Sequence, residues 1–237
     1  MAKTTRTLVN FILDKSGSMQ SVCEATISGF NEYIQSLKKD KKNKYDFSLV
    51  LFDTNIIKQH VNTPIEKIKP INKETYNPDG WTALYDAVCS TIDAVQKTVT
   101  KNQKVLTVIM TDGEENSSKE YTQEQLKKRV SELERAGKWT FVFLGANQDS
   151  WLNAQKFGIS KQNTSNFQAT DVGMARSMQI LTNNTAMFAS ASSGQTEDFF
   201  SPQDQDTLNN TTTNPISEHF SNLGKKSWEA RKKKYFQ

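Results

Sequence analysis

Residues 8–19 constrain the fold of this chain more than any other stretch. Residues 8–13 form a largely apolar run rich in strand formers, and the run ends abruptly at Asp14 in the sequence Asp-Lys-Ser-Gly-Ser-Met. A helical pattern follows at once, with apolar residues spaced by four and three positions at Met19, Cys23, Ile27, Phe30, Ile34 and Leu37. In an open α/β sheet, ligands bind where a strand ends and the chain turns into a helix. This junction carries an acid and two hydroxyls, and it lacks the glycine array that cradles phosphate groups.

Strand-like and helix-like segments alternate along most of the chain. After a first strand at 7–13, strands are predicted over residues 46–52, 56–61, 104–111, 139–144 and 164–168, and helices over residues 84–95, 122–136, 149–157 and 171–188. The short connection before the strand at 56–61 predicts a hairpin, and therefore an antiparallel strand at the sheet edge. Three prolines between residues 62 and 81 predict a long loop there. The alternation predicts an α/β fold with a doubly wound, mostly parallel sheet and helices on both faces.

The composition changes after residue 190. Residues 192–219 are dominated by Ser, Thr, Asn, Gln and Asp, whereas residues 225–237 carry six basic residues and one acidic residue. We therefore expect one domain over residues 1–190, followed over residues 191–237 by a polar linker and a basic tail that is partly disordered or forms a short helix. The tail contributes +5 to the net charge of +4, so the rest of the chain sums to about −1 and gives no case for nucleic-acid binding by the domain.

The two cysteines and the N-terminus bear on the cellular compartment. Cys23 and Cys89 fall in apolar helical stripes, which predicts buried free thiols in preference to a disulfide or a metal site. The apolar run that stops at Asp14 is too short for a signal peptide, and no stretch has the length of a transmembrane helix. We expect a cytoplasmic protein without a membrane span.

Three loops offer oxygen ligands at junctions between strands and helices. The first carries Asp14, Ser16 and Ser18, the second carries Thr82, and the third carries Asp112. Each loop taken singly also fits a helix cap or a turn. Their occurrence together, in this order, favours a site for a hard divalent cation, because Mg²⁺ prefers an octahedron of oxygen ligands. Three neutral hydroxyls and two carboxylates leave such an ion electron-poor, so it would attract a carboxylate from outside.

The three loops resemble the metal-ion-dependent adhesion site of von Willebrand factor A (vWA) domains. The resemblance covers residues 5–188, and residues 14–19 are its most specific part. It implies a Rossmann-like fold whose six-stranded sheet has one antiparallel edge strand. It also implies that Asp14, Ser16, Ser18, Thr82 and Asp112 bind Mg²⁺ or Mn²⁺, and that the metal recognises a Glu or Asp of a protein partner. The lack of an export signal and of disulfides indicates a stand-alone bacterial or phage form.

Catalytic sites have less support in the sequence. The only histidines, His60 and His219, lie in a presumptive edge strand and in the polar tail, so neither a Ser-His-Asp arrangement nor a zinc pattern is present. A metal-dependent phosphoester hydrolase could use Asp14, Asp112 and Glu115. However, Ser16 stands where phosphoaspartate phosphatases that resemble this fold need a second acid. We therefore predict an interaction module that is not an enzyme and has no small-molecule substrate.

Other conspicuous residues admit two interpretations each. Glu114 and Glu115 are expected on a solvated face of their loop. Trp81 lies beside the proposed site, where an exposed contact and core packing are equally compatible with its sequence position, whereas Trp139 opens a buried strand and is expected in the core. The basic run at 231–234 can bind nucleic acid or an anionic surface, although a solvated tail is favoured.

Overall fold

In the computed structural model, residues 5–146 and 150–209 are described. They form one six-stranded sheet in the order β3-β2-β1-β4-β5-β6. The strands are β1 (Arg6–Asp14), β2 (Tyr45–Phe52), β3 (Ile56–Pro64), β4 (Gln103–Thr111), β5 (Trp139–Gly145) and β6 (Thr164–Asn166). All neighbouring pairs are parallel except β2 and β3, which are antiparallel. The predicted doubly wound sheet with one antiparallel edge strand is therefore confirmed.

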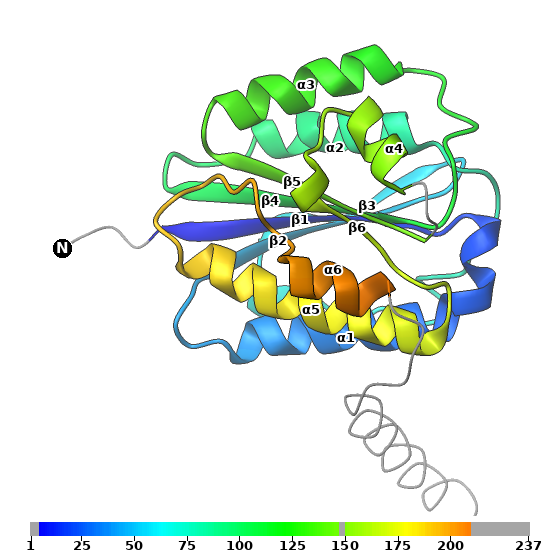
Figure 1. Cartoon of the computed structure of the whole chain (residues 1–237), viewed down its shortest axis with the longest axis horizontal. Helices are drawn as coiled ribbons and strands as arrows, with labels where there is room; N and C mark the ends of the chain where they lie inside the picture. Colours follow the sequence, from blue (N-terminus) through cyan, green and yellow to red (C-terminus); the bar gives the residue numbers. More distant parts are fainter. Residues whose placement is uncertain (1–4, 147–149, 210–237) are drawn as a thin grey trace, which may run out of the picture.

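Helices cover both faces of the sheet (Figure 1). One face carries α1 (Cys23–Lys39), α5 (Asp171–Ser190) and α6 (Pro202–Asn209), and the other carries α2 (Leu84–Gln96), α3 (Gln123–Arg135) and α4 (Ser150–Lys156). Short 3-10 helices occur at η1 (Gly17–Val22), η2 (Ile65–Lys67) and η3 (Lys161–Asn163). The helical pattern that starts at Met19 thus begins as a 3-10 turn and becomes α-helical only at Cys23.

The two hydrophobic cores follow from the alternation of side chains along the central strands. In β1, Val9 and Phe11 pack on the face of α1 and α5, whereas Leu8 and Ile12 pack on the face of α2 and α3. Burial on both faces explains why the central strands read as near-continuous apolar runs. The edge strand β3 is only partly buried, in keeping with its mixed sequence. These central strands hold the loops at their carboxyl ends in fixed positions.

Several local predictions are confirmed in detail. Thr122 and Gln125 form a capping box at the start of α3, with reciprocal hydrogen bonds between side chain and backbone. Cys23 and Cys89 are free and buried, and Trp139 is in the core. Within the described part of the chain, every helix is too short or too polar to cross a membrane.

The segment after α5 differs from the expected polar linker. Phe199 and Phe200 are buried in the core that the sheet forms with α1 and α5, and α6 begins two residues later. The Asn184 amide on α5 donates to the Phe199 carbonyl at 2.8 Å, and the Arg176 guanidinium donates to the Thr207 carbonyl at 3.1 Å. Two adjacent aromatic residues thus anchor a segment that is polar on average. The predicted basic tail lies outside the described residues from 210 onward.

Candidate metal centre

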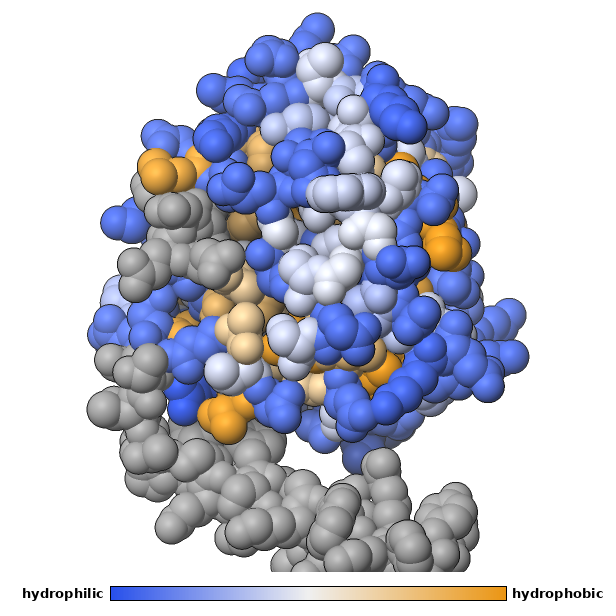
Figure 2. Space-filling model, turned by 90° about the vertical axis from the view of Figure 1, so that its right-hand side faces the viewer, coloured by the Kyte–Doolittle hydropathy of each residue, from blue (hydrophilic) through white to orange (hydrophobic). Residues whose placement is uncertain are grey.

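The five predicted ligands come together at the carboxyl ends of the parallel strands. Asp14 is the last residue of β1, and Asp112 directly follows the neighbouring strand β4. Ser16 and Ser18 lie at the turn into η1, and Thr82 lies two residues before α2. This end of the sheet is on the right in Figure 1. Figure 2 views it face-on, with residues of intermediate hydropathy at its centre, some hydrophobic residues beside them and hydrophilic residues toward the rim.

A chain of hydrogen bonds joins four of these five residues. The Ser16 amide donates to Asp14 Oδ1 at 2.6 Å. The Ser16 and Ser18 hydroxyls lie 3.2 Å apart, and the Ser18 hydroxyl donates to Asp112 Oδ1 at 2.6 Å. The Thr111 hydroxyl donates to Asp14 Oδ2. Thr111 is not among the predicted site residues, but its side chain orients the second oxygen of the Asp14 carboxylate.

Gly113 shows how closely the three loops converge. A Cβ atom on this residue would lie 2.9 Å from Thr82 Oγ1, 3.5 Å from Ser18 Oγ and 3.8 Å from Asp14 Oδ2. The space beside Gly113, in the third loop, is therefore within about 4 Å of oxygen atoms from both the first and the second loop. Any side chain at position 113 would enter this space. Hard cations are bound by such clusters of oxygen atoms. The residue types and their convergence fit a divalent metal ion.

The electrostatic environment of the carboxylates also fits a cation. Asp14 is completely buried, and burial raises its pKa to about 6 even though hydrogen bonds from Thr111 and Ser16 act in the opposite direction. Burial likewise raises the pKa of Asp112. None of the ion pairs among the described residues involves Asp14. A cation would relieve the cost of holding this buried carboxylate in its ionised form.

The donor set is dominated by hydroxyls. Within residues 5–146 and 150–209, no group of three or more His, Cys, Asp or Glu side chains is placed to hold a metal ion. The site therefore differs from the acid-rich or cysteine-rich centres that carry their own charge compensation. An ion held mainly by neutral oxygens retains much of its positive charge for a further ligand.

The loop that precedes α2 is fastened to the first loop. The Tyr76 hydroxyl donates to the Asp14 carbonyl at 2.7 Å, and the Asp79 amide donates to the Lys15 carbonyl at 2.8 Å. The Gly17 amide in turn donates to the Gly80 carbonyl at 3.1 Å. Gly80 has a φ of +74°, in the left-handed region that favours glycine. These bonds hold Thr82 beside the first loop.

A buried ion pair connects the same loops to the β2–β3 turn. Lys15 lies between two predicted ligands in the sequence, but its ammonium group pairs with Asp53. Both residues are buried, and Asp53 Oδ1 also accepts from the Asn55 amide at 2.6 Å. The Asp53 carbonyl accepts from the Ala83 amide at 3.0 Å, next to Thr82. The pair and the bond from Ala83 therefore connect the first loop to the second through Asp53.

The loop after Asp112 fixes the start of α2. Asn116 Oδ1 accepts from the Thr82 amide at 2.8 Å, and the Asn116 amide donates to the Thr82 carbonyl at 3.1 Å. The Glu115 carboxylate accepts from the Tyr85 amide at 3.0 Å. It also accepts from the amides of Ser117 and Ser118 and from the Ser118 hydroxyl. The expectation that Glu115 lies on a solvated face is thus wrong, because its carboxylate caps backbone amides, while Glu114 is exposed as expected.

Of the two alternatives for Trp81, an exposed contact or core packing, the structure shows the exposed one. It has an exposed fraction of 66%, although Thr82, the next residue, is buried. The Trp81 amide donates to Thr54 Oγ1 at 2.9 Å, so its backbone is fixed while its side chain faces solvent.

The fold has counterparts in known proteins. The von Willebrand factor type A domain family matches residues 9–184, whereas comparison with curated proteins gives no match. One similar solved structure is proximal thread matrix protein 1 from the mussel byssus, with a zinc-occupied metal-ion-dependent adhesion site (MIDAS) motif. Its TM-score is 0.53, and the identity is 13% over 77% of this chain and 48% of that chain. This chain thus spans about half the length of the mussel protein.

Two further structures show the same fold at low identity. Manganese-loaded TRAP protein of Plasmodium vivax has a TM-score of 0.50 and 14% identity over 70% of each chain. The vWF domain of the type V pili tip protein Mfa5 from Porphyromonas gingivalis has a TM-score of 0.56 and 10% identity over 80% of this chain and 98% of that domain. The family match begins within β1, ends within α5 and contains all three loops. This chain belongs to the von Willebrand factor type A domain family.

Proposed function

We propose that this chain is a divalent-metal-dependent protein-interaction module. Asp14, Ser16, Ser18, Thr82 and Asp112 would hold Mg²⁺ or Mn²⁺, and a Glu or Asp of a partner protein would bind at the metal. The observation that carries the proposal is the convergence of oxygen atoms from separate loops on the space that a Cβ atom on Gly113 would fill. The bound metal would supply positive charge to an anionic ligand.

The chemistry of the donors supports recognition of a carboxylate. Asp14 and Asp112 supply two negative charges, and the three hydroxyls supply none, so the ion keeps an affinity for a further anionic oxygen. The related structures carry zinc in a MIDAS motif in the mussel protein and manganese in TRAP protein, which supports a divalent metal at the corresponding loops. The choice between Mg²⁺ and Mn²⁺ is left to titration of each ion.

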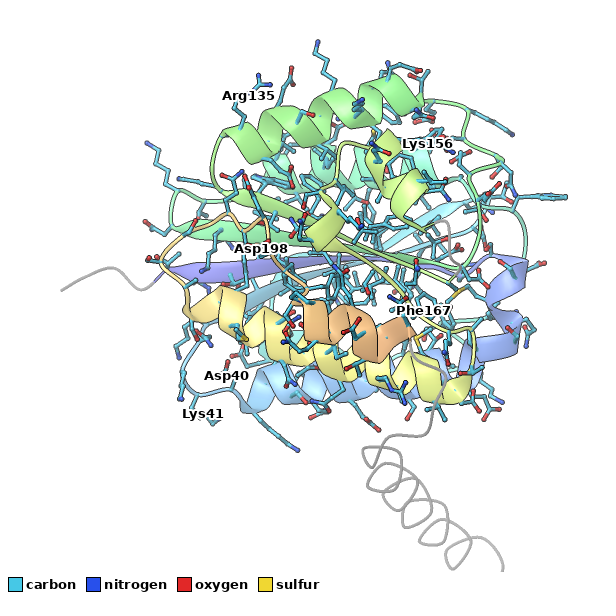
Figure 3. All side chains as sticks on the ribbon, viewed as in Figure 1. Asp40, Lys41, Arg135, Lys156, Phe167 and Asp198 are labelled. Atoms are coloured by element: carbon cyan, nitrogen blue, oxygen red, sulfur yellow. The ribbon has the colours of Figure 1, made fainter. Side chains whose placement is uncertain are left out.

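The metal site is tested by isothermal titration of Mg²⁺ and Mn²⁺ into the full chain. Asp14→Asn removes a charge while keeping the size of the side chain, and Thr82→Ala removes one hydroxyl. We expect both variants to lose or greatly weaken metal binding. Asp198→Asn is a matched control, because Asp198 is exposed and lies toward the opposite end of the domain (Figure 3). Equal binding by Asp14→Asn and the wild type would refute the metal site.

The recognition of a partner is tested by capture from source-cell lysate. We expect proteins that bind the wild-type chain in Mg²⁺ and are absent both in EDTA and with Asp14→Asn. Partners that are indifferent to both changes would refute recognition through the metal and would assign binding to another surface.

Neither alternative function is favoured by a specific observation. A phosphoester hydrolase that uses Asp14, Asp112 and Glu115 would need a free carboxylate at Glu115, but that group already accepts four hydrogen bonds from the α2 and 117–118 segments. Turnover of generic phosphoesters that is lost in Asp112→Ala would support this alternative. The basic tail, which could tether the chain to nucleic acid or an anionic surface, lies outside the described residues.

A further inference from the structure

We propose that Trp81 is a specificity-determining contact for the partner, and that it takes a Lys or Arg side chain one or two residues from the carboxylate bound at the metal. This inference rests on the proposed function. It assigns the partner a sequence pattern, an acidic residue with a basic residue close by, in addition to the acidic residue itself.

Trp81 is exposed to an unusual degree for its size. Among the side chains whose burial the structure describes, five large apolar ones are exposed, and Trp81 is the aromatic one of these: Ile57, Trp81, Leu152, Val172 and Met187. Its indole ring stacks on no other ring and covers no Lys or Arg among the described residues. Exposed aromatic residues are enriched at sites of protein recognition.

The backbone on either side of Trp81 is held rigidly. The Trp81 amide bonds to Thr54, and the Gly80 carbonyl accepts from the Gly17 amide. A Cβ atom on Gly80 would lie 2.9 Å from Thr54 Oγ1, so the chain passes close to the β2–β3 turn. The amide of the next residue, Thr82, donates to Asn116 Oδ1, and its carbonyl accepts from the Asn116 amide. An aromatic group on a fixed backbone loses little entropy on binding.

The position of Trp81 relative to the proposed metal site sets how far the partner's basic residue lies from its metal-bound carboxylate. Thr82 contributes its hydroxyl to the cluster around Gly113, and the Cα atom of Trp81 lies about 3.8 Å from that of Thr82 across their peptide bond. An extended segment advances about 3.3 Å per residue. A partner whose carboxylate binds the metal therefore brings a residue one or two positions away within reach of the indole ring.

The charge around Trp81 favours a cation over an apolar group. Asp79 precedes Trp81 by two residues in the same loop and is exposed, and Glu114 is exposed in the loop fastened to Thr82. Lys15, the basic residue within the first loop, is paired with Asp53, so its charge is compensated. Tryptophan is the best aromatic partner for a cation, and nearby carboxylates strengthen the attraction.

The proposal is tested by selecting random 12-residue peptides displayed on phage with the full chain in Mn²⁺, after subtraction of peptides that bind Asp14→Asn. We expect enriched peptides to share a Glu or Asp with a Lys or Arg within two residues. The same selection on Trp81→Leu should keep the acid and lose the preference for a nearby base. Trp81→Phe should retain that preference, and Met187→Ala serves as the control for loss of an exposed apolar side chain elsewhere.

Affinities of one enriched peptide measure the contact directly. We expect about 2- to 30-fold weaker binding by Trp81→Leu than by the wild type, the range of a cation–aromatic contact. Replacing the basic residue of the peptide by norleucine should weaken wild-type binding by a similar factor and leave Trp81→Leu unaffected. Unchanged thermal unfolding of Trp81→Leu would exclude a folding defect as the cause.

The outcomes separate this inference from the proposed function. An acid that is enriched together with an apolar neighbour, or a basic neighbour that persists with Trp81→Leu, would overturn the role of Trp81 and leave the metal site standing. A selection without acidic peptides, or peptides bound equally in EDTA, would instead overturn the proposed function.

Discussion

Replacing Lys15 by Met is the most direct test of how the loops are braced. The Lys15–Asp53 pair is almost fully buried, with 11% and 8% of the two side chains exposed. Met preserves the aliphatic stem but leaves the Asp53 carboxylate buried without its cation. Removing one member of a buried ion pair costs about 3–5 kcal/mol. Because Asp53 keeps its hydrogen bond from the Asn55 amide, we expect the lower end of that range, about 3 kcal/mol.

The measurement is urea unfolding of the full chain in EDTA at neutral pH. Lys73→Met is the matched control, because Lys73 pairs with Glu24 at the surface, where both side chains are more than 70% exposed. We expect little change in the free energy of unfolding for that variant. The double variant Lys15→Met/Asp53→Asn should recover at least about 1 kcal/mol relative to the sum of the single changes, since neither charge is then left alone.

A loss in Lys15→Met as small as that in Lys73→Met would refute this reasoning. It would mean that Asp53 remains well solvated and that the brace behind the metal site contributes nothing to stability. Additivity of the two single changes in the double variant would lead to the same conclusion.

Three further results are expected. Gly113→Ala should abolish Mn²⁺ binding in calorimetric titration, because its Cβ atom would lie 2.9 Å from Thr82 Oγ1. In metal-free protein the pKa of Asp14 is raised, so between about pH 4 and 6 the folded state keeps a proton that the unfolded state has already released. The contribution of Asp14 to stability therefore falls as the pH rises through that range. Urea unfolding should show this loss, of about 3 kcal/mol at most, in the wild type and not in Asp14→Asn, whereas Mg²⁺ affinity should rise over the same range. Phe200→Ala should cost about 3–5 kcal/mol in the same assay, because Phe200 is buried, whereas Met187→Ala should change stability by less than about 0.5 kcal/mol.

The fold could be predicted from the sequence because its central strands have two buried faces. Runs such as residues 104–111 carry apolar residues at most positions, and such runs are distinct from amphipathic helices. The order of strands and helices along the chain then allows few topologies. The boundary after residue 190 was harder to predict, because burial of Phe199 and Phe200 depends on packing against the core beside α1 and α5, which composition does not reveal.

The predicted ligands could be found because each lies at the end of a strand or just before a helix. The residues that position them were not predicted, since their partners are distant in sequence: Thr111 bonds to Asp14, and Glu115 bonds to the Tyr85 amide. A charged residue in a polar loop resembles a solvated side chain until the backbone amides around it are known. Only the three-dimensional structure distinguishes these two cases.

The direction of Lys15 explains how a buried carboxylate remains available to a metal ion. Lys15 is adjacent to Asp14 in the sequence, and a lysine that paired with Asp14 would compete with any divalent ion. Asp53, which directly follows β2, instead pairs with the ammonium group. The same aspartate accepts from the Ala83 amide and so fixes the loop of Thr82. Because one residue both removes the competing cation and positions a proposed hydroxyl ligand, the β2–β3 turn is part of the proposed metal site although it supplies none of the ligands.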